Sequence, residues 1–229
     1  MLPAVELLFI RHGEPAWDEA GLAVDDPALT DRGIEQARLL GRALRGLRAD
    51  QLLVSPLRRA QQTAEPIADA LGLEPTTLPW LAEISMGRWQ GTPSEAVERA
   101  FRENRGRPLE EQWEGIPGGE SFRHFHARVT GGLQEMLDGA GVLRLSEHPP
   151  LWKLCEPERR IVVVAHGGTN AVSLGYLLGI EPVPWEWERF VSFHASVSTL
   201  QPVDISSGHT FSLLRFADTT HLPVELQTR

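Results

Sequence analysis

Polar side chains follow two strongly apolar runs of the sequence at the point where each run ends. Arg11 and His12 follow residues 5–10, and His166 follows residues 160–165. Runs of β-branched and aliphatic residues of this length are typical of buried strands. An arginine guanidinium offers fixed donors that suit phosphate, and an imidazole can act as a nucleophile or carry a proton. The two strand ends therefore favour phosphate chemistry over the alternative, in which Arg11 and His12 only cap a strand.

The apolar run 51–54 predicts a third strand, which leads through Ser55 into a helix that carries Arg58 and Arg59. In a parallel sheet the carboxyl ends of the strands lie at one edge, where open α/β folds bind ligands. We therefore expect two histidines and at least one arginine to converge at this edge. Without carboxylates to complete a metal site, such a cluster suits an anion, and phosphate fits it best. The sequence thus predicts a phosphate site that uses no metal and no cofactor.

Strands alternate with helices along the chain. Amphipathic stretches between the strands predict helices over residues 30–47, 57–71, 94–105, 121–137 and 167–178. Residues 196–201 and 211–216 predict two late strands, and the proline-containing stretch 139–158 predicts a long loop. This alternation predicts an α/β fold, a three-layer sandwich with a mostly parallel central sheet and helices on both faces.

Size and charge limit the class of protein and its partners. The 229 residues fit one α/β domain with insertions. The formal net charge of −9 argues against a nucleic acid or an anionic membrane as partner, because either would require a broad basic face. The single cysteine, Cys155, cannot form an internal disulfide, and the first residues lack the basic leader of a secretory signal. We therefore expect a cytoplasmic protein.

The motifs at these strand ends belong to a series that extends along nearly the whole chain. The series is Phe9-Ile10-Arg11-His12-Gly13-Glu14, Ser55-Pro56-Leu57-Arg58-Arg59-Ala60, Glu83-Ile84-Ser85-Met86-Gly87, Gly119-Glu120-Ser121 and Val164-Ala165-His166-Gly167-Gly168-Thr169. In this set and order the chain resembles the histidine phosphatase superfamily, in the branch that contains cofactor-dependent phosphoglycerate mutases and small bacterial phosphatases. The resemblance implies a phosphoglycerate mutase-like fold in one domain, residues 1–229, with a variable insertion around 93–130 and a long loop around 139–158.

The resemblance implies a chemical role for five residues. His12 is the implied nucleophile, which attacks phosphorus in line and becomes a phosphohistidine. Arg11, Arg59 and His166 are the implied clamp on the phosphoryl oxygens, where they oppose the charge of the transition state. Glu83 is the implied proton donor to the leaving alkoxide and then takes a proton from the attacking water. Taken without the resemblance, Glu83 would be interpreted as a solvated loop carboxylate.

The resemblance also suggests which residues bind the rest of the substrate. Gly167 follows His166 in its motif, and Trp17 lies close enough to the Arg-His motif to wall the pocket. Asp18 stands where relatives carry an asparagine, so its charge would repel a substrate carboxylate or a second phosphate. An apolar-walled pocket would favour a substrate with a ring or a chain beyond its phosphate.

Several further side chains are expected near the site or in the core. Trp113 lies in the variable insertion and is expected to line the pocket, whereas Trp185 and Trp187 are interpreted as core or interface residues. His194 is expected to support the site without reacting. The sequence does not predict the natural substrate or the oligomeric state, and a homodimer stays open.

The leading hypothesis is a metal-independent phosphomonoester hydrolase that acts on a small phosphorylated metabolite through phosphohistidine. One alternative is a phosphoglycerate mutase-type phosphoryl transferase, which is weakened because Pro15, Asp18 and residues 86–91 depart from the mutase pattern. A second alternative is a non-catalytic protein that binds a phosphate ligand on the same fold. It is weakened because none of the residues with an implied chemical role is missing.

Overall fold

The computed structural model describes residues 5–155 and 159–229. Within this part of the chain, a central eight-stranded sheet has the order β5-β4-β8-β1-β9-β10-β7-β6. Its strands are β1 (Val5–Arg11), β4 (Gln51–Val54), β5 (Thr76–Thr77), β6 (Val142–Ser146), β7 (Leu151–Leu154), β8 (Arg159–Ala165), β9 (Val197–Ile205) and β10 (Gly208–Asp218). A separate small hairpin is formed by β2 (Asp18–Glu19) and β3 (Leu22–Ala23).

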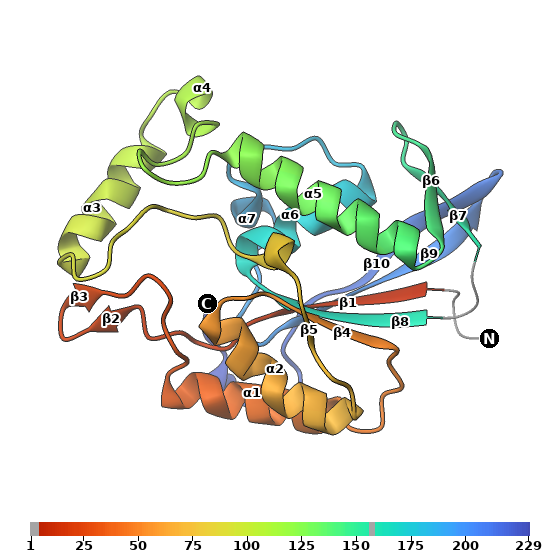
Figure 1. The fold of residues 1–229 in the computed structure, drawn as a ribbon, viewed down its shortest axis with the longest axis horizontal. Coiled ribbons are helices and arrows are strands. Elements are labelled where there is room, and N and C mark those ends of the chain that lie inside the picture. Colours follow the sequence, from red (N-terminus) through yellow and green to blue (C-terminus); the bar gives the residue numbers. More distant parts are fainter. Residues whose placement is uncertain (1–4, 156–158) are drawn as a thin grey trace.

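Helices cover both faces of the central sheet (Figure 1). The helices are α1 (Asp31–Ala43), α2 (Arg58–Leu71), α3 (Ser94–Arg105), α4 (Leu109–Gln112), α5 (Phe122–Gly139), α6 (Gly167–Leu178) and α7 (Glu186–Arg189), with 3-10 turns η1 (Pro79–Leu81) and η2 (Val224–Leu226). Helices α1 and α2 lie on one face, and α5 and α6 lie on the other. The predicted α/β fold with helices on both sides of a sheet is confirmed. No helix in the described ranges is long and apolar enough to cross a membrane.

The sheet is mixed, although the sequence predicts a mostly parallel one. Strands β5, β4, β8 and β1 pair in parallel, whereas β9, β10, β7 and β6 continue the sheet in antiparallel pairs. Short turns join β6 to β7 and β9 to β10, and a short turn can join only antiparallel neighbours. The parallel half is the half that carries the predicted polar residues at its carboxyl ends.

The stretch 139–158 is not a long loop, as the sequence predicts, because β6 and β7 form a hairpin within it. Pro149 and Pro150, two of the prolines that suggested a loop, occupy the turn between the strands, where no ladder amide is needed. Trp152 of β7 is fully buried, and its ring contacts that of Phe211 edge-on at 5.6 Å. The hairpin extends the sheet at the end far from α3 (Figure 1), so it does not cover the predicted site. Residues 156–158 of this stretch lie outside the described residues.

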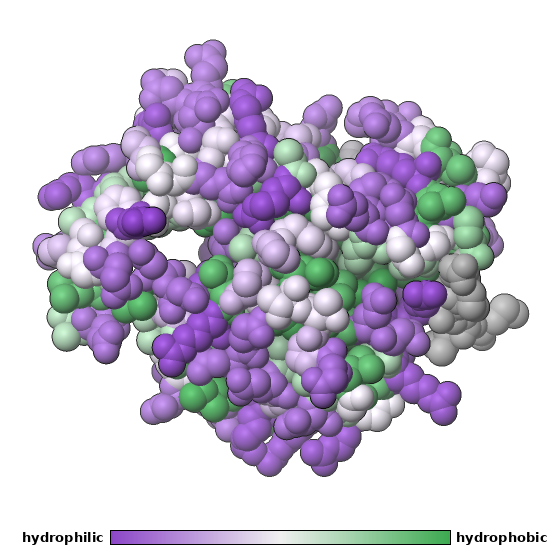
Figure 2. Space-filling model, viewed as in Figure 1, coloured by the Kyte–Doolittle hydropathy of each residue, from purple (hydrophilic) through white to green (hydrophobic). Residues whose placement is uncertain are grey.

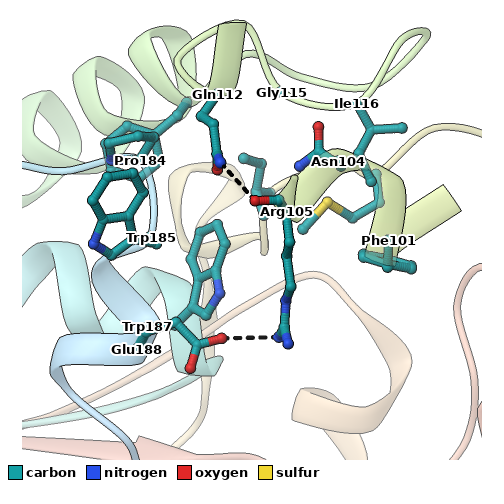
Figure 3. A pocket seen from close by; sticks show the side chains of 13 residues that line it. Phe101, Asn104, Arg105, Gln112, Gly115, Ile116, Pro184, Trp185, Trp187 and Glu188 are labelled. Carbon is teal, nitrogen blue, oxygen red and sulfur yellow. Dashed lines mark hydrogen bonds and ion pairs between the residues drawn. The ribbon is translucent and has the colours of Figure 1, made fainter. Parts of the chain in front are cut away.

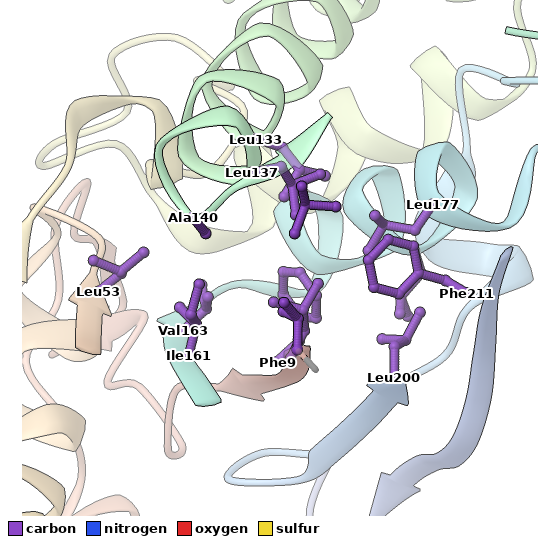
Figure 4. Packing of buried hydrophobic residues seen from close by; sticks show 14 of the residues in the cluster. Phe9, Leu53, Leu133, Leu137, Ala140, Ile161, Val163, Leu177, Leu200 and Phe211 are labelled. Carbon is purple, nitrogen blue, oxygen red and sulfur yellow. The ribbon is translucent and has the colours of Figure 1, made fainter. Parts of the chain in front are cut away.

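The alternation of side chains along the parallel strands divides the core into two layers. Leu7 and Phe9 face the α5–α6 side, and Leu8 and Ile10 face the α1–α2 side. Figure 4 shows the first layer, in which Phe9, Ile161 and Val163 from the strands meet Leu133 and Leu137 of α5 and Leu177 of α6. Because both faces of β1 and β8 are buried, their carboxyl ends are held by packing from both sides. Residues at those ends therefore stand on fixed backbone.

Burial of Trp152 generates a prediction about stability. Trp152→Ala removes a fully buried ring that joins the β6–β7 hairpin to the sheet, so the free energy of unfolding should fall by roughly 3–5 kcal/mol. Urea unfolding followed by circular dichroism measures the change. The control is Leu145→Ala on β6, where the side chain is 50% exposed and the expected change is within about 0.5 kcal/mol. Equal stability of the two variants would contradict the assignment of the hairpin to the core.

Candidate active site

The turn that follows β1 is fixed by a close approach between two backbone segments. The His12 amide donates to the Ala165 carbonyl at 3.0 Å, which continues the β1–β8 pairing past Arg11. A Cβ atom on Gly13 would lie 2.6 Å from the carbonyl oxygen of Gly33, so the start of α1 can approach only a glycine here. Thr30 caps α1 by accepting from the Gly33 amide at 3.0 Å. Contacts with β8 and with the start of α1 thus fix the backbone of residues 11–13.

His12 is 3% exposed, and its two ring nitrogens have different partners. Nδ1 lies 2.7 Å from the carbonyl oxygen of Gly13, which can only accept, so Nδ1 carries the proton. Nε2 therefore holds a lone pair, which accepts from Nε of Arg59 at 3.3 Å. Burial, then the neighbouring His166, Arg59 and Arg11, lower the pKa of His12 well below its ordinary value. The ring is neutral, with its lone pair on Nε2, as a nucleophile requires.

His166 meets His12 across the β1–β8 pair, with ring centroids 5.0 Å apart. Its Nε2 lies 2.7 Å from the hydroxyl of Ser55, the residue that follows β4. Its Nδ1 is buried and has no hydrogen-bond partner within the described ranges. Burial and the nearby arginines lower the pKa of His166 well below its ordinary value. The expected convergence of the two imidazoles is therefore present, although His166 itself is 0% exposed.

Two arginines stand beside the imidazoles. Arg11 donates from Nη1 to the Ser192 carbonyl at 2.5 Å and from Nη2 to Nε2 of His194 at 3.2 Å. Burial lowers the pKa of Arg11 to about 10. Arg59 is 2% exposed, its guanidinium lies 4.7 Å from the centre of the Trp17 ring, and burial lowers its pKa as well. Both guanidiniums have lost most of their water, which strengthens their attraction to an anion.

Glu83 is held at the N-terminus of α6. One carboxylate oxygen accepts from the Gly168 amide at 2.9 Å, and the other accepts from the Ile84 amide at 3.0 Å. A Cβ atom on Gly168 would lie 2.5 Å from this carboxylate, so only glycine lets Glu83 dock here. Glu83 is therefore a positioned group, and the alternative of a solvated loop carboxylate is wrong.

These groups surround a cleft of about 310 Å³ at the carboxyl ends of the parallel strands. Figure 2 shows a hollow on the same side of the molecule, between the α3–α4 segment and the body. The predicted site residues that line the cleft are Arg11, His12, Trp17, Arg59, Glu83 and Gly167. His166 does not line it and lies buried against His12. His194 is buried and lies between Arg11 and Thr228, where it orients the guanidinium as expected.

Two residues that were expected to bind substrate lie elsewhere. Asp18 belongs to β2, is exposed, and accepts hydrogen bonds from the Gly21 amide and the Ser94 hydroxyl. Asp18 is not among the residues that line the cleft, so its assignment to the substrate site is wrong: the carboxylate is held by partners on the hairpin and at the start of α3. Trp113 packs edge-on against Phe122 at 5.5 Å and does not line the cleft either.

Further residues that line the cleft were not predicted from the sequence. Arg105 of α3, Trp187 and Glu188 of α7, and Arg229 also line the cleft. Trp187 was interpreted as a core or interface residue, and the other three come from segments that carry no motif. The place of Ser55 beside His166 could have been predicted from the sequence, because Ser55 follows β4 in the same way as His12 follows β1. No cluster of three His, Cys, Asp or Glu side chains that could hold a metal ion occurs among the residues that the structure describes.

Comparison with known proteins agrees with this arrangement. The family model of the histidine phosphatase superfamily (branch 1) matches residues 7–218. Phosphoserine phosphatase 1 of Hydrogenobacter thermophilus is 36% identical over 135 residues, which cover 58% of this chain and 64% of that protein. A probable phosphoglycerate mutase GpmB of Yersinia enterocolitica is 31% identical over 190 residues, which cover 78% of this chain and 77% of that protein.

Solved structures are similar over nearly the whole chain. The structure of a putative alpha-ribazole-5'-P phosphatase from Escherichia coli superposes with a TM-score of 0.68 at 28% identity, and the match covers 93% of this chain and 97% of that one. Phosphoserine phosphatase from Entamoeba histolytica, solved with 3-phosphoglyceric acid, gives a TM-score of 0.64 at 27% identity, covering 96% of this chain and all of that one (100%). The resemblance predicted from the motifs is confirmed.

The buried histidines predict a pH dependence of stability. Because His12, His166 and His194 have lowered pKa values in the folded state, that of His194 to about 3, they stay neutral there while the unfolded chain takes up protons below pH ~6.5. Stability is therefore complete above this pH and falls as the pH drops from 7 to 5. Each histidine contributes a slope of at most about 1.4 kcal/mol per pH unit.

Urea unfolding at several pH values measures this slope. His194→Gln removes one titrating ring. The dependence of the free energy of unfolding on pH should therefore become less steep by the contribution of one histidine, at most about 1.4 kcal/mol per pH unit. A free energy of unfolding that stays constant between pH 7 and pH 5 would show that these rings bind protons equally in both states.

Proposed function

This chain belongs to the histidine phosphatase superfamily, and we propose that it hydrolyses phosphate monoesters through a phosphohistidine formed on His12. The observation that carries the proposal is the unprotonated Nε2 of His12, whose lone pair accepts from the guanidinium of Arg59 in a cleft also lined by Arg11 and Glu83. A neutral nucleophile next to two desolvated cations suits attack on a phosphate dianion, because the cations offset the charge repulsion. The substrate would be a small phosphorylated metabolite.

In the first step Nε2 of His12 attacks phosphorus and the bond from phosphorus to the ester oxygen breaks. Arg11 and Arg59 hold the equatorial oxygens, and Glu83 gives its proton to the leaving alkoxide. In the second step Glu83, now a carboxylate, takes a proton from water, which attacks the phosphohistidine. The products are the alcohol, inorganic phosphate and free His12, with Glu83 protonated again.

Ser55 and His166 have a supporting part in this scheme. If the Ser55 hydroxyl donates to Nε2 of His166, Nδ1 of His166 carries the proton and can donate to a phosphoryl oxygen. Since His166 has no exposed surface, this contact needs a small movement of the ring toward the cleft. Ser55 would thus be a positioning residue that sets the tautomer of His166.

Phosphohistidine formation gives the direct test. Acid quenching during turnover of an aryl phosphate should trap phosphate on His12, detected by mass spectrometry as an acid-labile, base-stable adduct. His12→Ala should lower kcat/KM by a factor of roughly a thousand or more, because the nucleophile is lost. A chelator should leave the rate unchanged.

The matched control is His209→Ala, a histidine on β10 that pairs with Asp204 at the surface, which should keep the wild-type rate. Full activity of His12→Ala would overturn the proposal. Activity that requires a bisphosphate primer and releases little phosphate would favour the mutase alternative. Bound phosphate ester without turnover or adduct would favour the non-catalytic alternative.

Proton donation by Glu83 is tested by changing the leaving group. Glu83→Gln should lower kcat for alkyl phosphates by roughly a hundredfold or more, because an alkoxide needs a proton to leave. The loss should be much smaller for an ester of an acidic nitrophenol, whose anion leaves unaided. Equal losses for the two esters, measured as kcat from initial rates of phosphate release, would remove Glu83 from the role of proton donor.

A further inference from the structure

A second cavity of about 510 Å³ opens beside the phosphate cleft (Figure 3). The two spaces share five lining residues, which are Ile84, Met86, Arg105, Trp187 and Glu188. The second cavity lies between α3, α4 and the segment that leads into α7. A molecule whose phosphoryl group sits at His12 would therefore have its remaining part directed into this space.

Aromatic side chains form much of the wall of the second cavity. Phe101 comes from α3, Phe122 from the start of α5, and Trp185 and Trp187 from the α7 segment. In Figure 3 the Trp187 ring stands between Trp185 and Arg105. Aromatic walls of this kind favour flat, apolar partners, because rings stack on or against one another with little loss of side-chain freedom.

The inner wall is held in place by the core. Phe122 is 1% exposed and contacts three other rings edge-on: Trp187 at 6.3 Å, Phe125 at 6.1 Å and Trp113 at 5.5 Å. Trp113 thus supports the wall from behind. A wall fixed in this way binds a ring without first having to order itself, which lowers the entropic cost of binding.

The charges at the mouth of the cavity are already paired. Among its lining residues the charged ones are Arg105 and Glu188, whose side chains form an ion pair at 2.9 Å. Glu188 also lies 3.7 Å from Arg229. Gln112 donates to the backbone carbonyl of Arg105 at 3.1 Å. Apart from this ion pair, the residues that line the cavity carry no charge, which favours an uncharged leaving group.

We propose that this cavity receives the leaving-group alcohol of the substrate, and that the preferred substrates are monophosphates of an uncharged alcohol with a flat, largely apolar ring system. The inference rests on the proposed function. The phosphoryl group is transferred to Nε2 of His12 as the ester bond breaks, and Glu83 protonates the alcohol oxygen. The alcohol then leaves from between Trp187 and the Arg105–Glu188 pair. Small alcohols that carry a carboxylate are poorer leaving groups in this site.

The test compares two alkyl esters with leaving groups of similar acidity, naphthylethyl phosphate and ethyl phosphate. Burial of the naphthyl ring should raise kcat/KM by at least about tenfold over ethyl phosphate, because apolar surface is removed from water only in the first ester. Naphthylethanol should inhibit competitively at concentrations where ethanol does not. Phosphoserine should be a poorer substrate than naphthylethyl phosphate.

A substitution in the wall of the second cavity tests whether the naphthyl ring binds there. Phe101→Ala removes a ring that lines only the second cavity, so the preference for naphthylethyl phosphate over ethyl phosphate should fall by about threefold or more. The matched control is Arg102→Ala, the next residue of α3, whose exposed side chain pairs only with Glu98 and which should keep the preference.

Equal kcat/KM values for the two alkyl esters, or a preference for phosphoserine, would overturn the inference while leaving the proposed function intact. A naphthyl preference that Phe101→Ala and Arg102→Ala reduce equally would also overturn it. Failure of the proposed function has a different signature, which is hydrolysis of neither ester and no phosphate trapped on His12.

Discussion

The site depends on the parallel pairing of β1 with β8. Seven residue pairs join these strands, from Val5 with Arg159 to Arg11 with Ala165, and the His12 amide adds one further hydrogen bond to Ala165. The chain leaves both strands at the same level, so the imidazoles of His12 and His166 face each other. Since both strands are buried on both faces, neither ring can drift without disturbing the core.

The burial of His12, His166, Arg11 and Arg59 determines the net charge of these four side chains. Two guanidiniums that have lost their water lie beside two imidazoles, and each imidazole is kept neutral by burial and by those cations. The carboxylates within reach are few: Asp26 lies 3.6 Å from Arg59, and Glu83 is occupied by amides of α6 and of its own segment. A bound phosphate dianion would supply the negative charge that the folded protein lacks here, at the place where the protein can least solvate its own cations.

The sequence predicts those parts of the site that follow directly from strand ends. His12 and His166 were predicted because an apolar run fixes where a strand stops, and a parallel sheet fixes where its ends meet. Arg59 was singled out from its neighbour Arg58 by the resemblance to the family. Asp18 was assigned because it stands where relatives carry an asparagine, but here it belongs to the exposed β2–β3 hairpin, and its carboxylate accepts from Gly21 and Ser94. The β6–β7 hairpin was missed because its prolines dominate the local pattern, and only the packing of Trp152 on Phe211 reveals the strands.

The sequence did not predict that Arg105, Trp187 and Glu188 line the cleft, and the reason is a different one. They lie on short or exposed helices with no apolar stripe that ties them to the sheet, and their meeting is set by how α3 and α7 pack in three dimensions. Nothing in their spacing along the chain encodes that meeting. The chemistry of the phosphate could be inferred from local patterns, but the shape of the neighbouring cavity could not.

Helices α3 and α4 contain no buried residue, although they supply part of the wall of the second cavity. The outer wall of the second cavity, which α3 and α4 supply, is thus separate from the buried core, whereas its inner wall at Phe122 belongs to that core. Surface substitutions in the outer wall of this cavity could therefore change which organic groups it accepts, while the residues of the phosphate cleft stay the same.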